Sequence, residues 1–377
     1  MDFGAVRLAF DPERGSSALR PIVSPFSLAA RAQNARFCCA RHKARYLRRH
    51  MHRREFIAVV GSAAIAWSVE ARAQKAPVRI GLLASGAAAS LASAAQIDAI
   101  HQGLRENGLV AGRDYVLEAR FAAGNYALFP QMARELAQTG ASVILTNTIA
   151  SVRAAQQLTP PVPVVMLAIN DPVGAGLVAN LARPGGHTTG MATLNEDLTP
   201  KLLEFQRAVL PKATSIAALF NPANPTNPVF LEKLKGHAGA TGMTVLPFEL
   251  QSPDALDTVF AALVAKRPDA LQIISDSGIL DLGDRIAVLA LAHRLPSFAT
   301  NPNFTEFGGL MAYGASRRHL FIKSTNYVKR ILEGANPGDL PVEQPTRIEL
   351  WINLKTAKAL GLDIPMNLLQ LADQVIE

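Results

Sequence analysis

The chain beyond residue 77 alternates short apolar runs with longer stretches in which apolar residues recur at helical spacing. The apolar runs predict strands, and the intervening stretches predict helices that end close to a glycine. This alternation is typical of an α/β fold built on parallel sheets. The first series contains expected strands at 78–84, 115–121, 142–146 and 162–168, and expected helices at 94–107 and 126–138.

A second series after Pro211 repeats the order strand, helix, strand, helix, strand. Its expected strands are 215–220, 244–248 and 270–274, and its expected helices are 225–240 and 254–266. Two similar open sheets explain this repetition more economically than one long sheet. Further strands are expected at 295–299, 310–313 and 347–352, with a helix through 320–332, a Gly- and Pro-rich loop at 334–345 and helices from near Leu354 and Pro365.

The segment before this body has the features of a cleavable export signal. Arg53 and Arg54 precede Phe56 and an apolar run, which ends at Ala71-Arg72-Ala73. A charged start, an apolar centre and a small-x-small end predict a signal peptide at 51–73, cleaved after Ala73. The paired arginines resemble the twin-arginine export signal, but His52 stands where that signal usually has Ser or Thr, so the general secretory route stays open.

Two alternatives for the amino-terminal region are weaker. A membrane anchor would need an apolar stretch of about 20 residues, which is longer than the one present. Residues 1–50 are rich in arginine and precede Met51, where an export signal would start. We therefore expect 1–50 to be a non-native or disordered extension, since a DNA-binding segment would need helical apolar spacing that is missing.

The charge of the chain is concentrated in this region. Residues 1–73 contain 13 Lys and Arg and 5 Asp and Glu, a net charge of +8, which equals the formal charge of the whole chain. The body is therefore neutral and is not expected to bind nucleic acid, which needs a concentrated cationic surface. Cys38 and Cys39 also lie before Ala73, so the body has no disulfide, no cysteine-ligated zinc and no thiol nucleophile.

Several short motifs occur along the chain in a characteristic order and spacing. They are Arg53-Arg54-Glu55-Phe56, Asn170-Asp171-Pro172-Val173, Gly176-Leu177-Val178, Arg183-Pro184-Gly185-Gly186, Asn221-Pro222-Ala223-Asn224-Pro225, the run 308–314 and the tail 352–362. Together they resemble the substrate-binding proteins of ABC uptake transporters, a family built on the type I periplasmic binding fold. The resemblance covers essentially all of 51–377.

The resemblance implies two doubly wound open-sheet lobes joined by a three-crossing hinge, with a ligand held in the cleft between them. On this chain, lobe 1 would comprise 76–192 plus 308–340, and lobe 2 would comprise 193–307 plus 341–377. The sequence pattern agrees, because a doubled α/β series followed by leftover elements is what a chain returning to each lobe would produce.

In open α/β sheets, ligands bind beyond the carboxyl ends of the strands. The candidate ligand-binding residues are Ser85, Asn147, Thr148, Asn170, Asp171, Asn221, Asn224, Asp276, Ser277 and Tyr313. Asn147 and Thr148 open a helix and are expected to receive an anionic group. An ammonium group needs a carboxylate partner, for which Asp276 is the first choice and Asp171 the second.

Each candidate also has a purely structural interpretation. Asp171 before Pro172 suits a helix N-cap, and Asp276 can cap the helix after its strand. Asn221 and Asn224 suit turns or caps, and the Tyr313 ring can simply pack. The turn at 183–186 is interpreted as structural only.

Catalysis finds little support in the sequence. The chain lacks a Gly-x-Ser-x-Gly elbow, a His-Glu-x-x-His motif, a phosphate-binding lysine loop and a dinucleotide-binding glycine motif. The five histidines of the body are dispersed, so no metal site, cofactor or enzymatic activity is expected. We expect a periplasmic, monomeric solute-binding protein that closes around a small solute, such as an amino acid or related carboxylate, and presents it to an ABC permease. A ligand-sensing module for a membrane signalling partner and a secreted α/β enzyme are the alternatives.

Overall fold

A computed structural model describes residues 76–193 and 195–377. The expected signal residues Arg53, Arg54, Phe56, Ala71 and Ala73, and both cysteines, lie outside the described residues. Within the described ranges, no helix combines the length and apolar character that crossing a membrane requires.

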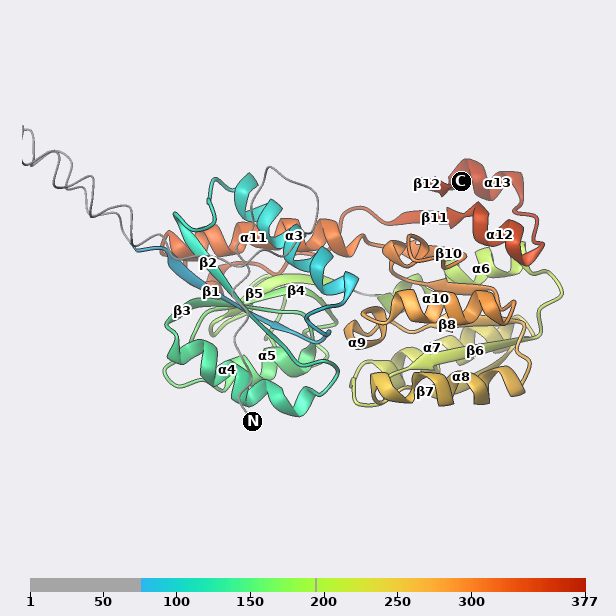
Figure 1. Cartoon of the computed structure of the whole chain (residues 1–377), viewed down its shortest axis with the longest axis horizontal. Coiled ribbons are helices and arrows are strands. Elements are labelled where there is room, and N and C mark those ends of the chain that lie inside the picture. The colour runs from blue at the N-terminus through green and yellow to red at the C-terminus, as the bar shows by residue number, and fades with distance from the viewer. Residues whose placement is uncertain (1–75, 194) are drawn as a thin grey trace, which may run out of the picture. The chain divides into compact units, whose positions relative to one another are not determined.

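The first sheet has five parallel strands in the order β2-β1-β3-β4-β5 (Figure 1). Four of its strands match the expected apolar runs to within two residues at each end. The strands are β1 (Val78–Ala84), β2 (Tyr115–Phe121), β3 (Ala141–Thr146), β4 (Val164–Asn170) and β5 (Thr188–Thr193).

Helices cover both faces of this sheet, which explains why its central strands are apolar at nearly every position. Ile80 and Leu82 of β1 pack with the face covered by α3 and α11, whereas Leu83 packs with the opposite face. The helices of this half are α3 (Leu91–Glu106), α4 (Phe129–Gln138), α5 (Ile149–Gln156) and α11 (Arg317–Leu332), with the 3-10 turns η2 (Tyr126–Leu128) and η6 (Pro337–Asp339).

The second sheet has seven strands in the order β12-β11-β10-β9-β8-β6-β7. All neighbouring pairs are parallel except β10 and β11, which are antiparallel. The strands are β6 (Ser215–Phe220), β7 (Thr244–Glu249), β8 (Ala270–Ile273), β9 (Ser297–Ala299), β10 (Met311–Gly314), β11 (Glu349–Asn353) and β12 (Gln374–Ile376).

Two apolar clusters bury the two faces of the second sheet. Phe205, Phe230 and Leu234 pack on one face, and Phe260 and Ile286 pack on the other. The helices are α6 (Thr199–Val209), α7 (Asn227–Ala240), α8 (Leu256–Ala265), α9 (Ser277–Leu280), α10 (Gly283–Ala292), α12 (Leu354–Leu360) and α13 (Met366–Leu371), with the 3-10 turns η3 (Asn195–Leu198), η4 (Pro253–Ala255) and η5 (Pro302–Thr305).

The chain passes between the two sheets three times, after β5, after β10 and before β11. We call the first sheet with α3, α4, α5 and α11 the first lobe, and the second sheet with its helices the second lobe. The expectation that 308–340 belongs wholly to the first lobe is wrong for its beginning. Strand β10 pairs with β9 and β11 in the second sheet, and the return to the first lobe begins at α11.

The sequence pattern missed two strands, β5 and β12. Strand β5 reads Thr-Thr-Gly-Met-Ala-Thr, so it lacks an apolar run although all six residues are buried. Its polar groups are satisfied internally: Gln156 Nε2 donates to Thr188 Oγ1 at 2.9 Å, and Thr189 Oγ1 donates to the Leu340 carbonyl at 2.7 Å. A search for apolar runs therefore missed this strand, because its buried threonines are polar and are accommodated by hydrogen bonds.

Candidate functional site

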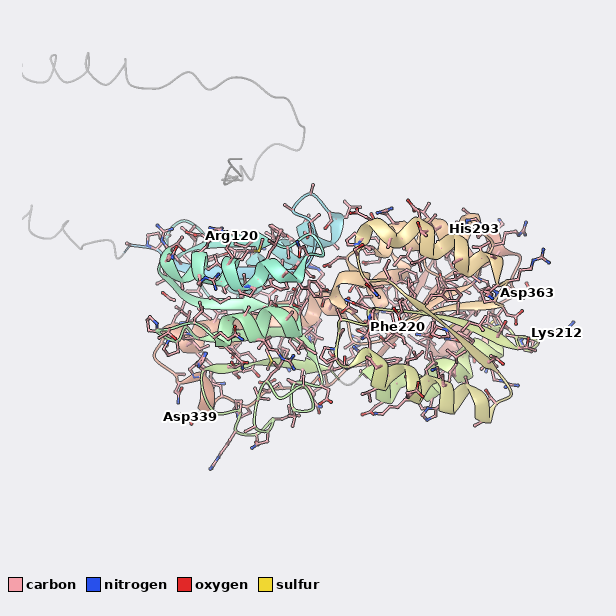
Figure 2. The ribbon with its side chains drawn as sticks, turned by 90° about the horizontal axis from the view of Figure 1, so that it is seen from below. Arg120, Lys212, Phe220, His293, Asp339 and Asp363 are labelled. Carbon is pink, nitrogen blue, oxygen red and sulfur yellow. The ribbon has the colours of Figure 1, made fainter. Side chains whose placement is uncertain are left out.

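Polar side chains gather where the strands of the two sheets end. Ser85 follows β1 and Asn147 follows β3, whereas Asn221 follows β6 and Asp276 comes shortly after β8. Figure 2 shows the direction of β6. Lys212, which precedes the strand, lies far from the first lobe, and Phe220, the last residue of the strand, lies on the side toward it. The predicted convergence of strand ends is therefore present for these four residues.

In the first lobe, Ser85 and Asn147 form one buried hydrogen-bonded unit. The Ser85 backbone N–H donates to Asn147 Oδ1 at 3.2 Å, and Asn147 Nδ2 donates to Ser85 Oγ at 3.3 Å. Thr148 caps α5: its Oγ1 accepts from the Ser151 N–H at 3.0 Å, and Ser151 Oγ accepts from the Thr148 N–H at 3.1 Å. This reciprocal capping fixes the start of α5 beside Asn147.

In the second lobe, Asp276 is the centre of a set of donors. Its side chain is almost fully buried, and it caps α9 by accepting from the Ile279 N–H at 3.1 Å. Asn221 Nδ2 donates to Oδ1 at 3.3 Å, and Asn224 Nδ2 donates to Oδ2 at 2.8 Å. The predicted capping role is thus real, and it leaves Oδ2 able to accept another hydrogen bond.

The asparagines around Asp276 are held by their own turns. Asn221 Oδ1 accepts from the Ala223 N–H at 3.0 Å, and Asn224 Oδ1 accepts from the Thr226 N–H at 3.1 Å. Asn227 at the start of α7 accepts from the Asn221 N–H and donates to the Ser275 carbonyl. These Asx turns orient both amide groups toward the Asp276 carboxylate, so the structural and the functional interpretations apply to the same residues.

Direct hydrogen bonds join the two groups across the lobes. Ser277 Oγ donates to the Asn147 carbonyl at 2.5 Å, and Ser85 Oγ donates to Asp281 Oδ2 at 2.6 Å. Asn195, in the chain crossing after β5, contacts both lobes: its backbone N–H donates to Asn170 Oδ1 at 2.9 Å, and its Nδ2 donates to Ser275 Oγ at 2.8 Å. The strand ends of both lobes therefore meet at one place.

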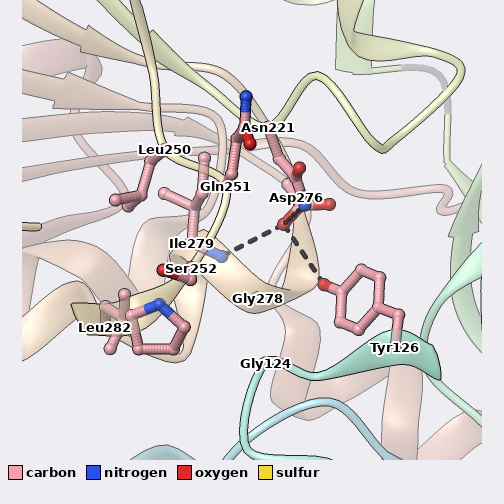
Figure 3. Close-up of a pocket in the computed structure, with 11 residues that line it drawn as sticks. Gly124, Tyr126, Asn221, Leu250, Gln251, Ser252, Asp276, Gly278, Ile279 and Leu282 are labelled. Atoms are coloured by element: carbon pink, nitrogen blue, oxygen red, sulfur yellow. Dashed lines mark hydrogen bonds between the residues drawn. The ribbon is translucent and has the colours of Figure 1, made fainter. Parts of the chain in front are cut away.

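A small pocket lies beside Asp276, with Tyr126 of the first lobe on one side and Asn221, Gly278 and Ile279 on the other (Figure 3). Its volume is about 20 Å³, close to the space that a single water molecule needs. The Tyr126 hydroxyl points at Asp276 and lies 3.5 Å from Oδ1. A molecule much larger than water does not fit in this space beside Asp276.

Tyr126 stays a hydrogen-bond donor over the physiological pH range. Burial raises the pKa of its phenol strongly, and the negative charges of Asp276 and Asp281 raise it further. The protonated Tyr126 hydroxyl therefore faces the Asp276 carboxylate as a hydrogen-bond donor facing an acceptor.

Asp281 carries a second buried carboxylate close to Asp276. Burial raises the pKa of its carboxyl group; Arg317 and the Ser85 hydrogen bond act in the opposite direction, and Asp276 adds to the rise. Arg317 Nη1 lies 3.7 Å from Asp281 Oδ1, and the Arg317 and Asp281 side chains are only 16% and 8% exposed. The site thus combines two carboxylates with one guanidinium group.

The other three candidate residues have different surroundings. Asn170 Oδ1 accepts from the Asn195 N–H at 2.9 Å and from Thr193 Oγ1 at 3.3 Å, at the end of β5 and just after it. Asp171 has φ +40° and accepts from the Gly174 N–H at 2.8 Å; it opens a turn, and the predicted helix after it is absent from 171–187. The Tyr313 ring packs edge-on against Phe205, with ring centroids 5.2 Å apart, as the structural interpretation expected.

The sequence pattern missed Gln96, Tyr126, Asn195, Asp281 and Arg317. Ser85 was found because ligands bind beyond the carboxyl ends of strands. The same rule could have identified Tyr126, which follows β2. It would also have identified Asn195 if β5 had been recognised as a strand. Asp281 and Arg317 gave no local signal in the sequence. Asp281 is recognised by its contacts with Ser85 and Arg317, and Arg317 by its contact with Asp281, and these contacts exist only in the folded chain.

Metal-binding clusters are absent from the described ranges 76–193 and 195–377: no group of three His, Cys, Asp or Glu side chains there could hold an ion.

Comparison with known proteins identifies relatives along most of the chain. Residues 89–376 match the family model of ABC transporter substrate binding proteins. The chain is 26% identical over 260 residues to a tyrosine-binding protein of Clostridioides difficile strain R20291, covering 69% of this chain and 74% of that protein.

Solved structures are similar as well. An ABC domain from Streptococcus pneumoniae in complex with L-Trp has a TM-score of 0.72 and 25% identity, covering 80% of this chain and all of the other. A leucine-binding protein from Thermotoga maritima has a TM-score of 0.51 and 14% identity, covering 75% and 87%, and shows similarity of fold alone.

Proposed function

Because the chain belongs to the family of ABC transporter substrate-binding proteins, we propose that it captures an amino acid or related carboxylate between its lobes and delivers it to an ABC permease. The family is one of solute-binding proteins and not of enzymes. The amino-acid class is supported by the names of the relatives, which bind tyrosine and L-Trp. Closure around the solute and monomeric action are part of this proposal.

The observation that carries the proposal is the buried Asp276 carboxylate between the two lobes. An ammonium group would bind its Oδ2, since a buried charge needs a partner of opposite charge. The solute carboxylate would lie toward Ser85, Asn147 and the start of α5, where hydrogen-bond donors concentrate. The two ends of an amino acid would then contact different lobes, so that both contacts exist only in the closed state.

Binding measurements on an Asp276→Asn variant test this assignment. Wild-type protein should bind L-tyrosine or L-tryptophan, and ligand at about a hundred times its dissociation constant should stabilise it by about 2.7 kcal/mol in thermal unfolding. Asp276→Asn should weaken an amine-bearing ligand about 30-fold or more, because removing one partner of a buried charge pair costs about 2–5 kcal/mol.

The deaminated analogue hydroxyphenylpropionate should lose much less affinity in this variant. Asp363→Asn is the matched control, because Asp363 is exposed and lies at the far end of the second lobe in Figure 2. An equal loss for ligands with and without the amine in Asp276→Asn would refute the ammonium assignment.

Export is a further part of the proposal. The segment 51–73 would direct the protein to the periplasm and be removed after Ala73, so that the mature protein begins at Gln74. Sequencing the amino terminus of the exported protein measures this, and a mature chain that keeps Arg53 and Arg54 would contradict it.

A further inference from the structure

Asp281 places a carboxylate from the second lobe against donors of the first. Ser85 Oγ donates to Asp281 Oδ2 at 2.6 Å, and Arg317 of α11 forms an ion pair with Oδ1 at 3.7 Å. The carboxylate lies directly over the Ser85–Gly86 backbone, since a Cβ atom on Gly86 would be 3.1 Å from Oδ2. Asp281 therefore occupies a position formed by β1, the loop after it and α11.

Arg317 is held in place for this contact. Its guanidinium carbon lies 5.2 Å from the centroid of the Phe321 ring, one helical turn further along α11. A guanidinium group packed on an aromatic ring and largely shielded from water gives a fixed, strongly directional donor for a carboxylate. Arg318, the next residue, instead faces solvent and pairs with Asp98 at 2.9 Å.

A buried donor of Gln96, which contacts Asn147, lacks a partner. The Ser85 N–H donates to Asn147 Oδ1, which turns Asn147 Nδ2 toward Gln96 Oε1 at 3.4 Å. Gln96 Nε2 is then left without a hydrogen-bond partner, although Gln96 is only 3% exposed. An unsatisfied buried donor is unfavourable, so the network formed by Ser85, Asn147 and Gln96 has capacity for an additional acceptor.

We propose that Ser85 and Arg317, next to Gln96, form a carboxylate-binding site that Asp281 occupies in this structure, and that a solute carboxylate competes with Asp281 for it. This proposal rests on the proposed function for the identity of the solute but not for the existence of the anion site. The Asp281 carboxylate occupies the site as an intramolecular ligand and so joins the lobes. A solute carboxylate displaces it by binding Ser85 and Arg317, with Gln96 Nε2 as a further donor.

Formate tests the anion site without any assumption about the solute. Asp281→Ala deletes the carboxylate and leaves Cβ, so formate supplies the missing atoms. At equal ionic strength, sodium formate should raise the unfolding midpoint of Asp281→Ala above its value in sodium chloride by about 2 °C or more. Wild-type protein should show a smaller difference, because Asp281 already fills the site.

The formate effect should disappear in Asp281→Ala/Arg317→Gln and persist in Asp281→Ala/Arg318→Gln, which removes a neighbouring exposed charge. An equal response to formate and chloride in Asp281→Ala, or an unchanged response after Arg317→Gln, would overturn the anion site.

The competition is tested with L-tyrosine and tyramine, which differ in the carboxylate. Removing Asp281 should strengthen tyrosine binding about threefold to tenfold. In the wild-type protein, tyrosine can bind only the fraction of molecules in which Asp281 has left the site, and this lowers the apparent affinity. Tyramine binding should stay within about twofold. Adding Arg317→Gln to Asp281→Ala should weaken tyrosine about tenfold and spare tyramine.

Equal changes for tyrosine and tyramine would overturn the competition. If formate stabilises Asp281→Ala through Arg317 but neither amino acid binds the wild-type protein, the anion site stands and the amino-acid assignment fails.

Discussion

At the residue scale, the carboxylates of the site differ in the groups that surround them. Asp276 and Asp281 lie in a shielded region, where one receives amide donors and the other an arginine. Asp276 could be predicted from sequence, because it follows an apolar run that ends a strand. Asp281 could not, because its partner Ser85 is 196 positions away and only the folded chain brings them together.

Asp269 lies at the starts of β6 and β8, away from the site, and its pKa is shifted in the opposite direction to that of Asp281. Its Oδ2 accepts from the backbone N–H groups of Thr214 and Ser215 at 2.8 and 2.9 Å and from both of their hydroxyls at 3.2 and 3.0 Å. Burial by itself raises the pKa of this carboxyl group, but the four hydrogen bonds outweigh it and lower the pKa below its usual value.

The pH dependence of stability should report this arrangement. Because the folded-state pKa of Asp269 is lowered, its stabilisation is present above the unfolded-state pKa of about 3.9 and is lost as pH falls through the folded-state value. Asp269→Asn should therefore cost about 1 kcal/mol at pH 7, a modest figure because the residue is exposed. Urea unfolding should show this difference shrinking below about pH 4; a difference that is unchanged at pH 3 would contradict the role of the charge.

At the element scale, the contact between α3 and α11 ties a late helix to the first lobe. Gly103 of α3 lies against α11, where a Cβ atom would be 2.5 Å from both the Ile322 carbonyl oxygen and Thr325 Oγ1. The apolar spacing predicted both helices, but it could not show that they touch. Their contact explains why 317–332 returns to the first lobe although β10 stays in the second sheet.

Substitution of glycines in two helices tests this contact. Gly103→Ala should destabilise the protein by about 1–3 kcal/mol, because the added methyl group must push α3 from α11. Gly236 in α7 is the control, since it is exposed and a Cβ atom there meets no atom within 4 Å. Gly236→Ala should stabilise by up to about 1 kcal/mol. Denaturant unfolding measures both, and equal effects would contradict the close approach.

At the scale of the whole molecule, two sheets present their strand ends to one another through three chain crossings. Repetition in the sequence predicted two open sheets, because periodic apolar runs are a local property. The position of β10 could not be predicted in this way, since the choice of sheet depends on pairing with β9 and β11. The residues that join the lobes were found only in part. Asn195 was missed because β5 was not recognised, and Arg317 was missed because its contact with Asp281 exists only in the folded chain.

The central claim is that the lobes close on a solute held between Asp276 and the strand ends of the first lobe. Small-angle X-ray scattering of the purified protein, with and without L-tyrosine at a concentration that calorimetry shows to be saturating, tests it most directly. Closure predicts a smaller radius of gyration with the amino acid than without it. Superimposable scattering profiles at saturation would contradict the account.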